Sequence, residues 1–329
     1  MSITYKKIIM EITVILLFLT IPLIASAQVF SPTDLIISAD TQNPEPNEEV
    51  TVQAEYYLSD TSRATVSWYK NGQLQSQGTG NIAFTFMAGD VGEQTSIRAV
   101  LVTQEGTTVS QTRNFTPVAL NLVWEAQTNV PPFYKGKALS TNNSPLRVVA
   151  LPRFESGSIK LSPNELFYEW FHNGNQLTEQ SGKGKNYVDV INVSGFGESV
   201  VSVTVLSPGK SLVTQKSISI PVTQPEIYFY EFDPLNGTNY RNALGENITV
   251  TQSQINIKGE PYFANKERLS ESRYTWTANN QPLATDSETP DVVTLVRNGG
   301  DGGRLIVRLL VESFGSMAQG LQKALTLTF

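Results

Sequence analysis

Few side chains in this sequence could do covalent chemistry. His172 is the only histidine and there is no cysteine, so a nucleophilic triad or a zinc site cannot be built in the usual way. Paired carboxylates could still support acid–base catalysis, but the acidic residues are scattered and nothing marks two of them for one pocket. The sequence therefore predicts no catalytic residue, no metal and no cofactor. His172 is expected to be a solvated residue beside a turn.

Two oxygen-rich segments are the candidates for calcium, which needs several oxygen ligands at close spacing. They are residues 233–239 and residues 286–291, which hold aspartate, asparagine and glutamate side chains. Neither segment follows a recognised calcium loop, and ordinary turn chemistry accounts for both.

An aromatic stretch favours binding rather than catalysis. Between Val130 and Lys137, two prolines and two lysines surround the adjacent Phe133 and Tyr134, and Lys135 follows them. One interpretation is a recognition loop that presents aromatic rings for stacking. The alternative is that these rings pack at a joint with a neighbouring domain.

These residues belong to a sequence that repeats a tryptophan motif. Trp68-Tyr-Lys-Asn-Gly recurs as Trp170-Phe-His-Asn-Gly and as Trp276-Thr-Ala-Asn-Asn, at intervals of 102 and 106 residues. Each tryptophan alternates with polar neighbours as on a strand with one buried face, so all three are expected in domain cores. The Asn-Gly pair closes a tight hairpin because both positions readily adopt a positive φ.

A buried tryptophan on the third strand, a tight Asn-Gly turn and a late glycine-led strand pair resemble the immunoglobulin-like and PKD-like domains of bacterial surface proteins. The resemblance covers nearly all of residues 28–329. It implies an all-β fold of three tandem immunoglobulin-like β-sandwich domains, at residues 28–117, 118–222 and 223–329. The aspartate-rich run of PKD domains and the cysteines of antibody domains are both missing. The resemblance carries no functional residue over to this chain.

Two features distinguish the last two repeats from the first. Trp124-Glu125 and Tyr134 correspond to Tyr230-Glu231 and Tyr240 at an offset of 106 residues. This correspondence favours the joint interpretation of the aromatic stretch. The segments before the second and third motif tryptophans, residues 153–166 and 259–273, are also long. They are expected to be loops at one end of a sandwich, where such domains often bind ligands, and the second contains Tyr262 and Phe263.

The first 27 residues predict an export signal. Lys6 and Lys7 precede a mostly apolar run that ends in Ala25-Ser-Ala27, the pattern of a secretory leader cleaved before Gln28. The alternative is an uncleaved segment that anchors the chain in a membrane, which is the one membrane contact expected. Either way the domains lie outside the cytoplasm.

The charge of the chain limits the classes of partner that it could bind. The net charge is −6, with no basic stripe, which argues against nucleic acid. The expected function is that of a non-enzymatic, exported cell-surface protein: an adhesin, or a spacer in an envelope or pilus-like assembly, with a protein or glycan partner. The first alternative is an array of carbohydrate-binding modules, and the second is a hydrolase with an inter-domain site.

The linkers between the predicted domains are short and contain proline. Prolines in both linkers, at residues 116–118 and 221–225, predict a semi-rigid rod.

Overall fold

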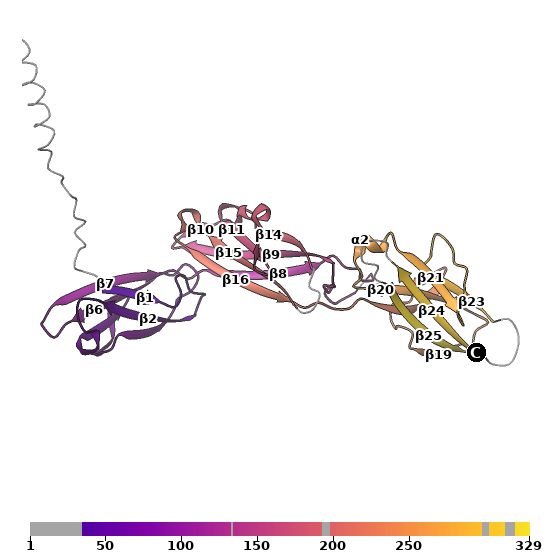
Figure 1. Cartoon of the computed structure of the whole chain (residues 1–329), viewed down its shortest axis with the longest axis horizontal. Helices are drawn as coiled ribbons and strands as arrows, with labels where there is room; N and C mark the ends of the chain where they lie inside the picture. The colour runs from indigo at the N-terminus through magenta and orange to yellow at the C-terminus, as the bar shows by residue number, and fades with distance from the viewer. Residues whose placement is uncertain (1–34, 133, 193–197, 298–302, 313–319) are drawn as a thin grey trace, which may run out of the picture.

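The computed structural model describes residues 35–132, 134–192, 198–297, 303–312 and 320–329. In these residues the chain is almost entirely β-strand and forms three β-sandwiches that lie end to end (Figure 1). The all-β class and the three tandem immunoglobulin-like sandwiches predicted from the sequence are confirmed. The predicted leader, residues 1–27, lies outside the described residues. No helix in the described ranges is long and apolar enough to cross a membrane.

Domain 1 comprises β1 (Leu35–Ala39), β2 (Glu49–Tyr56), the 3-10 turn η1 (Thr61–Arg63), β3 (Thr65–Lys70), β4 (Gln73–Thr79), β5 (Ala83–Met87), β6 (Thr95–Val102) and β7 (Thr108–Phe115). One sheet has the order β1-β2-β5 and the other β4-β3-β6-β7. Alternation sets the inward face, because every second side chain of a strand such as β2 is buried.

Domain 2 comprises β8 (Ala119–Ala126), β9 (Pro145–Ser156), β10 (Ile159–Leu161), η2 (Pro163–Glu165), β11 (Phe167–His172), β12 (Asn175–Gln176), η3 (Thr178–Gln180), β13 (Gly182–Lys183), β14 (Tyr187–Ile191), β15 (Ser199–Leu206), η4 (Pro208–Lys210) and β16 (Val213–Ile220). β8, β9 and β14 form one sheet, with β10 on its edge, and β12-β11-β15-β16 form the other, with β13 beside β11.

Domain 3 comprises β17 (Glu226–Asp233), β18 (Gly237–Thr238), β19 (Asn247–Thr249), β20 (Gln254–Tyr262), the single-turn helix α2 (Lys266–Leu269), β21 (Arg273–Ala278), β22 (Gln281–Pro282), β23 (Val292–Val296), β24 (Arg304–Glu312) and β25 (Gly320–Thr328). Its sheets have the orders β18-β17-β20-β23 and β19-β25-β24-β21-β22, and β19 pairs with β25 in parallel.

In all three domains, the strand after the asparagine turn pairs with the tryptophan strand. In the constant-type immunoglobulin plan, the fourth strand joins the sheet of the first, second and fifth. Here a two-residue turn ties the strand after each motif to the tryptophan strand, as in the β3–β4, β11–β12 and β21–β22 hairpins. Both turn positions have positive φ, for example 49° at Asn173 and 81° at Gly174, as the sequence predicts.

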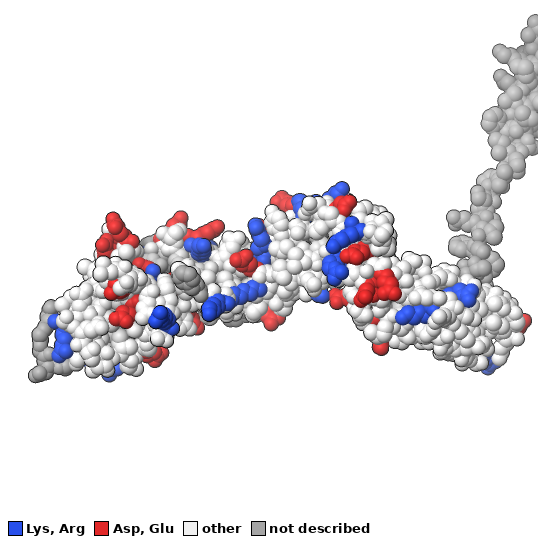
Figure 2. Space-filling model, turned by 180° about the vertical axis from the view of Figure 1, so that it is seen from behind, with Lys and Arg blue, Asp and Glu red and all other residues white. Residues whose placement is uncertain are grey.

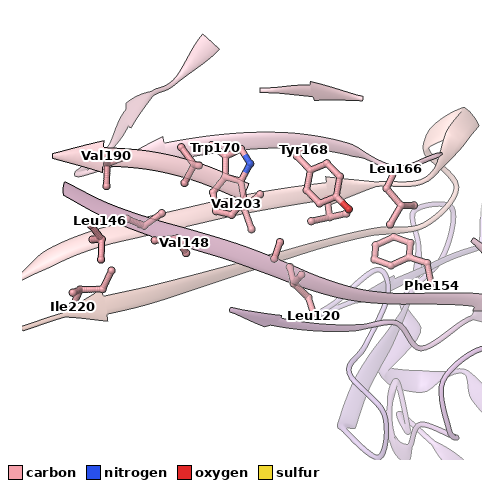
Figure 3. Packing of buried hydrophobic residues seen from close by; sticks show 14 of the residues in the cluster. Leu120, Leu146, Val148, Phe154, Leu166, Tyr168, Trp170, Val190, Val203 and Ile220 are labelled. Atoms are coloured by element: carbon pink, nitrogen blue, oxygen red, sulfur yellow. The ribbon is translucent and has the colours of Figure 1, made fainter. Parts of the chain in front are cut away.

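Each core is centred on its tryptophan, and Figure 3 shows the second core around Trp170. Trp68, Trp170 and Trp276 are 0, 0 and 1% exposed. Each indole N–H donates to a backbone carbonyl just before β5, β14 or β23, at Asn81, Lys185 and Pro290, over 2.9, 2.8 and 3.0 Å. These bonds satisfy the one polar group that each ring buries.

Candidate functional site

Hydrogen bonds between domains 2 and 3 close the joint between them. The chain leaves β8 into residues 127–144 and lies against the end of β20 and the start of α2. Asn129 is the centre of this contact. Its N–H donates to Ala264 O at 2.7 Å and its own carbonyl accepts from Phe263 N–H at 2.7 Å. Its side-chain amide donates to Glu260 Oε1 at 3.0 Å and to Pro261 O at 2.6 Å.

A cluster of aromatic rings covers one side of this joint. Tyr134 of domain 2 meets Tyr262 and Phe263 of domain 3 edge-on, with ring centroids 5.8 and 6.0 Å apart. Tyr262 also meets Tyr228 at 4.9 Å, and its hydroxyl lies 2.5 Å from that of Tyr230. Since Tyr134, Tyr262 and Phe263 each contact the other two, these three rings hold one another in fixed orientations.

An open groove of about 470 Å³ runs beside these rings, and we call it the joint groove. Domain 2 contributes Pro131, Tyr134 and Lys135, and domain 3 contributes Tyr240, Arg241 and Tyr262. Its volume falls within the range of about 300–1,000 Å³ that is typical of small-molecule sites. The joint groove is therefore an assembled feature, because neither domain forms it alone.

A buried carboxylate fixes the domain 3 side of the joint groove. Glu260 is 8% exposed. Its Oε2 accepts from the Tyr240 hydroxyl at 2.9 Å and lies 3.7 Å from Lys258 Nζ. Burial, and then the bond to Glu260, raise the pKa of Tyr240, while burial and the Tyr230 hydroxyl raise the pKa of Tyr262. Both phenols thus stay protonated at neutral pH, and Tyr240 donates its proton to Glu260.

The predicted binding residues separate into three groups. Tyr134, Tyr262 and Phe263 are brought together at the joint, where the packing interpretation placed Tyr134, and Lys135 lines the groove beside them. Phe133 lies outside the described residues. Asn129, Tyr240, Arg241 and Glu260 were not predicted from the sequence. Only the correspondence between Tyr134 and Tyr240 pointed toward this place.

The prediction that residues 153–166 and 259–273 are loops at one end of a sandwich is wrong. The first segment is mainly the β9–β10 hairpin with η2, and the second is the end of β20 with α2. Both contact the preceding domain: Gly157 N–H donates to Gly92 O at 3.3 Å, and Lys266 N–H donates to Gln127 O at 3.3 Å. Backbone groups in these segments pair across the joints, which turns long insertions into domain contacts.

The first joint is also built on backbone groups. Gly92 N–H donates to Pro117 O at 3.0 Å and Val118 N–H donates to Pro44 O at 3.0 Å. Asn43 then reaches domain 2, where its Oδ1 accepts from Val213 N–H at 2.9 Å. Both linkers are thus held by hydrogen bonds in addition to the stiffness of their prolines.

The remaining candidates from the sequence make local contacts. His172 is half-buried at the end of β11 with Nε2 2.8 Å from Ser199 Oγ, and burial lowers its pKa, so the expectation of a solvated turn residue is wrong. Asp233 accepts from the backbone of Leu235 and Asn236, and Asp286 accepts from that of Glu288. Within the described ranges, no three histidine or acidic residues gather as a metal site would require.

Comparison with solved structures finds multi-domain arrays among the matches. No family model matches, and no curated protein matches in sequence. Among solved structures, fibronectin(III)-like modules of Clostridium thermocellum CbhA match at 17% identity and a TM-score of 0.29, covering 57% of this chain and 95% of theirs. Three N-terminal domains of the bacteriophage RB49 outer capsid protein Hoc match at 12% and 0.27, covering 89% and 97%. The central fibronectin-III array of RIM-binding protein matches at 12% and 0.28, covering 88% and 96%. At these TM-scores the fold assignment rests on the sheet topology above.

Proposed function

We propose that this chain is a non-catalytic, exported spacer of the cell surface that holds its binding surfaces at a fixed distance and orientation. An adhesin or a component of an envelope or pilus-like assembly would use the chain in this way. The sequence of the N-terminal 27 residues supports the export, and the end-to-end arrangement of the domains supports the spacer role (Figure 1).

The hydrogen bonding of Asn129 is the observation that carries this proposal. A flexible joint needs only a linker between the two domains. Asn129 instead forms four hydrogen bonds with residues of domain 3. Breaking such bonds in a half-buried setting leaves unpaired polar groups, each at a cost of about 1–3 kcal/mol. The second joint therefore resists bending.

The surface charge is compatible with an exposed position. Figure 2 shows acidic and basic side chains interspersed over one face of the three domains, with no broad field of one sign. A mixed surface keeps an extended protein soluble without drawing it to nucleic acid.

Distance measurements across the second joint test the spacer role. Because the chain has no cysteine, Asn175→Cys in β12 and Gln281→Cys in β22 place single spin labels at exposed positions of domains 2 and 3. We expect a narrow distance distribution. It should broaden in Asn129→Asp, which sets a second carboxylate against Glu260, and it should stay narrow in Asn121→Asp on the exposed face of β8.

One outcome of the distance measurement would contradict the spacer role. A parent distribution as broad as that of Asn129→Asp would mean that the joint bends freely despite its hydrogen bonds. Small-angle scattering on the same proteins reports the whole molecule, since three domains packed side by side would give a radius of gyration near that of a globular chain, about 19 Å.

A further inference from the structure

The joint groove is basic in an otherwise acidic protein. Lys135 and Arg241 line it from the two domains, and both are exposed. Neither has an ion-pair partner within the described ranges. No acidic side chain lines the groove, although the chain carries a net charge of −6. Two unpaired cations that face one open groove favour an anionic ligand.

The rings of the groove add a second requirement. Tyr134 is 37% exposed, and its contacts with Tyr262 and Phe263 hold it in place. Tyr240 is held in the same way by Tyr230, at a centroid distance of 5.1 Å. A fixed, half-exposed tyrosine offers a flat apolar surface beside a polar hydroxyl, at little entropic cost on binding. The C–H face of a sugar ring matches such a surface.

Small polar groups complete the lining. Thr238 and Asn239 place a hydroxyl and an amide in the groove beside the rings, and such groups pair with the hydroxyls of a sugar. A ligand with flat C–H faces, many hydroxyls and negative charge would satisfy the rings, the amide and the two cations together.

We propose that the joint groove binds an acidic sugar chain, one whose residues carry carboxylate or sulfate groups. Tyr134 and Tyr240 provide the ring surfaces, and Lys135 and Arg241 pair with the anionic groups from opposite domains. Binding requires both domains in their present arrangement. The proposal concerns a surface that a spacer does not need, so the distance measurements above and the binding measurements below can fail separately.

Titration calorimetry on the mature chain tests the proposal with three probes. Oligogalacturonate carries carboxylates, carrageenan oligosaccharides carry sulfates, and cello-oligosaccharides are neutral. We expect binding of at least one acidic probe, weakened by salt, and none of the neutral one. A difference between the two acidic probes identifies which anionic group the site takes.

Variants then place the binding in the groove. Arg241→Ala and Lys135→Ala each remove one charge-assisted contact and should weaken binding about tenfold, and Tyr134→Ala should do the same through the lost ring. Lys183→Ala and Tyr187→Ala make the same changes at exposed positions of domain 2 outside the groove and should leave affinity within about twofold.

Several results would overturn the proposal. Failure of both acidic probes to bind, equal binding of the neutral probe, or affinity that survives both Arg241→Ala and Lys135→Ala would each do so. Binding of polyglutamate with the same dependence on Arg241 would show that the groove takes an acidic peptide instead of a sugar. Because Lys135 and Arg241 are exposed, their variants keep the fold, and loss of binding reports the site itself.

Discussion

At the scale of single residues, small side chains decide how closely each tryptophan can be packed. Ala54 in β2, Ala150 in β9 and Gly259 in β20 stand at equivalent positions, where each backbone N–H donates to a carbonyl beside the one that pairs with the indole. In domain 3 the side chains approach so closely that a Cβ on Gly259 would lie 2.1 Å from Leu309 Cδ2. The core is close-packed and has no free volume for a Cβ at this position.

Gly259→Ala should therefore destabilise domain 3 by about 1–3 kcal/mol, the usual cost of an overpacked core. Chemical denaturation followed by tryptophan fluorescence measures this. Gly245→Ala is the matched control, because its Cβ would meet nothing closer than 3.9 Å, and it should change stability by less than about 0.5 kcal/mol. Equal effects from both variants would contradict the close packing.

A buried phenol makes domain 2 sensitive to alkali. Burial raises the pKa of Tyr168 to about 12, and its hydroxyl donates to Pro163 O at 3.0 Å. The folded pKa lies above the unfolded value of about 10, so this group's stabilisation is complete below pH 10 and is lost as the pH rises toward 12. Thermal unfolding across this range should show the loss, and Tyr168→Phe should show a shallower dependence on pH between 10 and 12.

At the scale of elements, the asparagine turns hold two strands at once. The N–H and Oδ1 of Asn71, Asn173 and Asn279 pair with the backbone of Ser96 in β6, Val200 in β15 and Ile306 in β24, respectively. Each turn therefore links the tryptophan strand both to its hairpin partner and to the next strand of the sheet. These two bonds explain why asparagine occupies the first turn position in all three motifs. The second turn position is glycine in domains 1 and 2 and Asn280 in domain 3.

Two substitutions at Asn173 separate its roles. Asn173→Gly keeps the positive φ and the backbone bond to Val200 O but loses the bond from Val200 N–H to Oδ1, so domain 2 should lose about 1 kcal/mol. Asn173→Ala also strains the backbone, because its φ is 49°, and should lose about 2 kcal/mol or more. Equal stability of the two variants, measured by denaturant unfolding, would show that backbone strain does not contribute.

At the scale of the whole molecule, domain arrangement depends on backbone groups that meet across the joints. Gly92 is the tightest point of the first joint: its φ is +78°, and an added Cβ would lie 2.8 Å from Glu155 Cβ in domain 2. Glycine is required here both for the conformation and for the approach of the β9–β10 hairpin.

Gly92→Ala should loosen the first joint. Gly106→Ala provides the control, since it has a similar φ of +86° and open space around it, so both variants strain domain 1 by about 1–2 kcal/mol. Only Gly92→Ala should broaden the distances between spin labels at Gln73→Cys and Asn175→Cys. Broadening in both variants would trace the effect to domain 1 itself rather than to the joint.

The sequence by itself determined the all-β class, the three tryptophan cores and the hairpin turns. These features are local: alternation marks a buried strand face within a few residues, and an Asn-Gly pair marks a turn wherever it stands. In the third motif Asn280 replaces the turn glycine, and it also adopts a positive φ, of 65°.

Only the tertiary structure decided where the corresponding aromatics go. Tyr240 packs within its own domain on Tyr230, whereas Tyr134, at the matching position, turns outward to the next domain, and Lys137 takes the place over the Trp124 ring at 3.3 Å. The joint groove depends on that difference. It unites Lys135 and Arg241 from separate domains, and no pattern within either repeat encodes a contact that forms only when two folded domains meet.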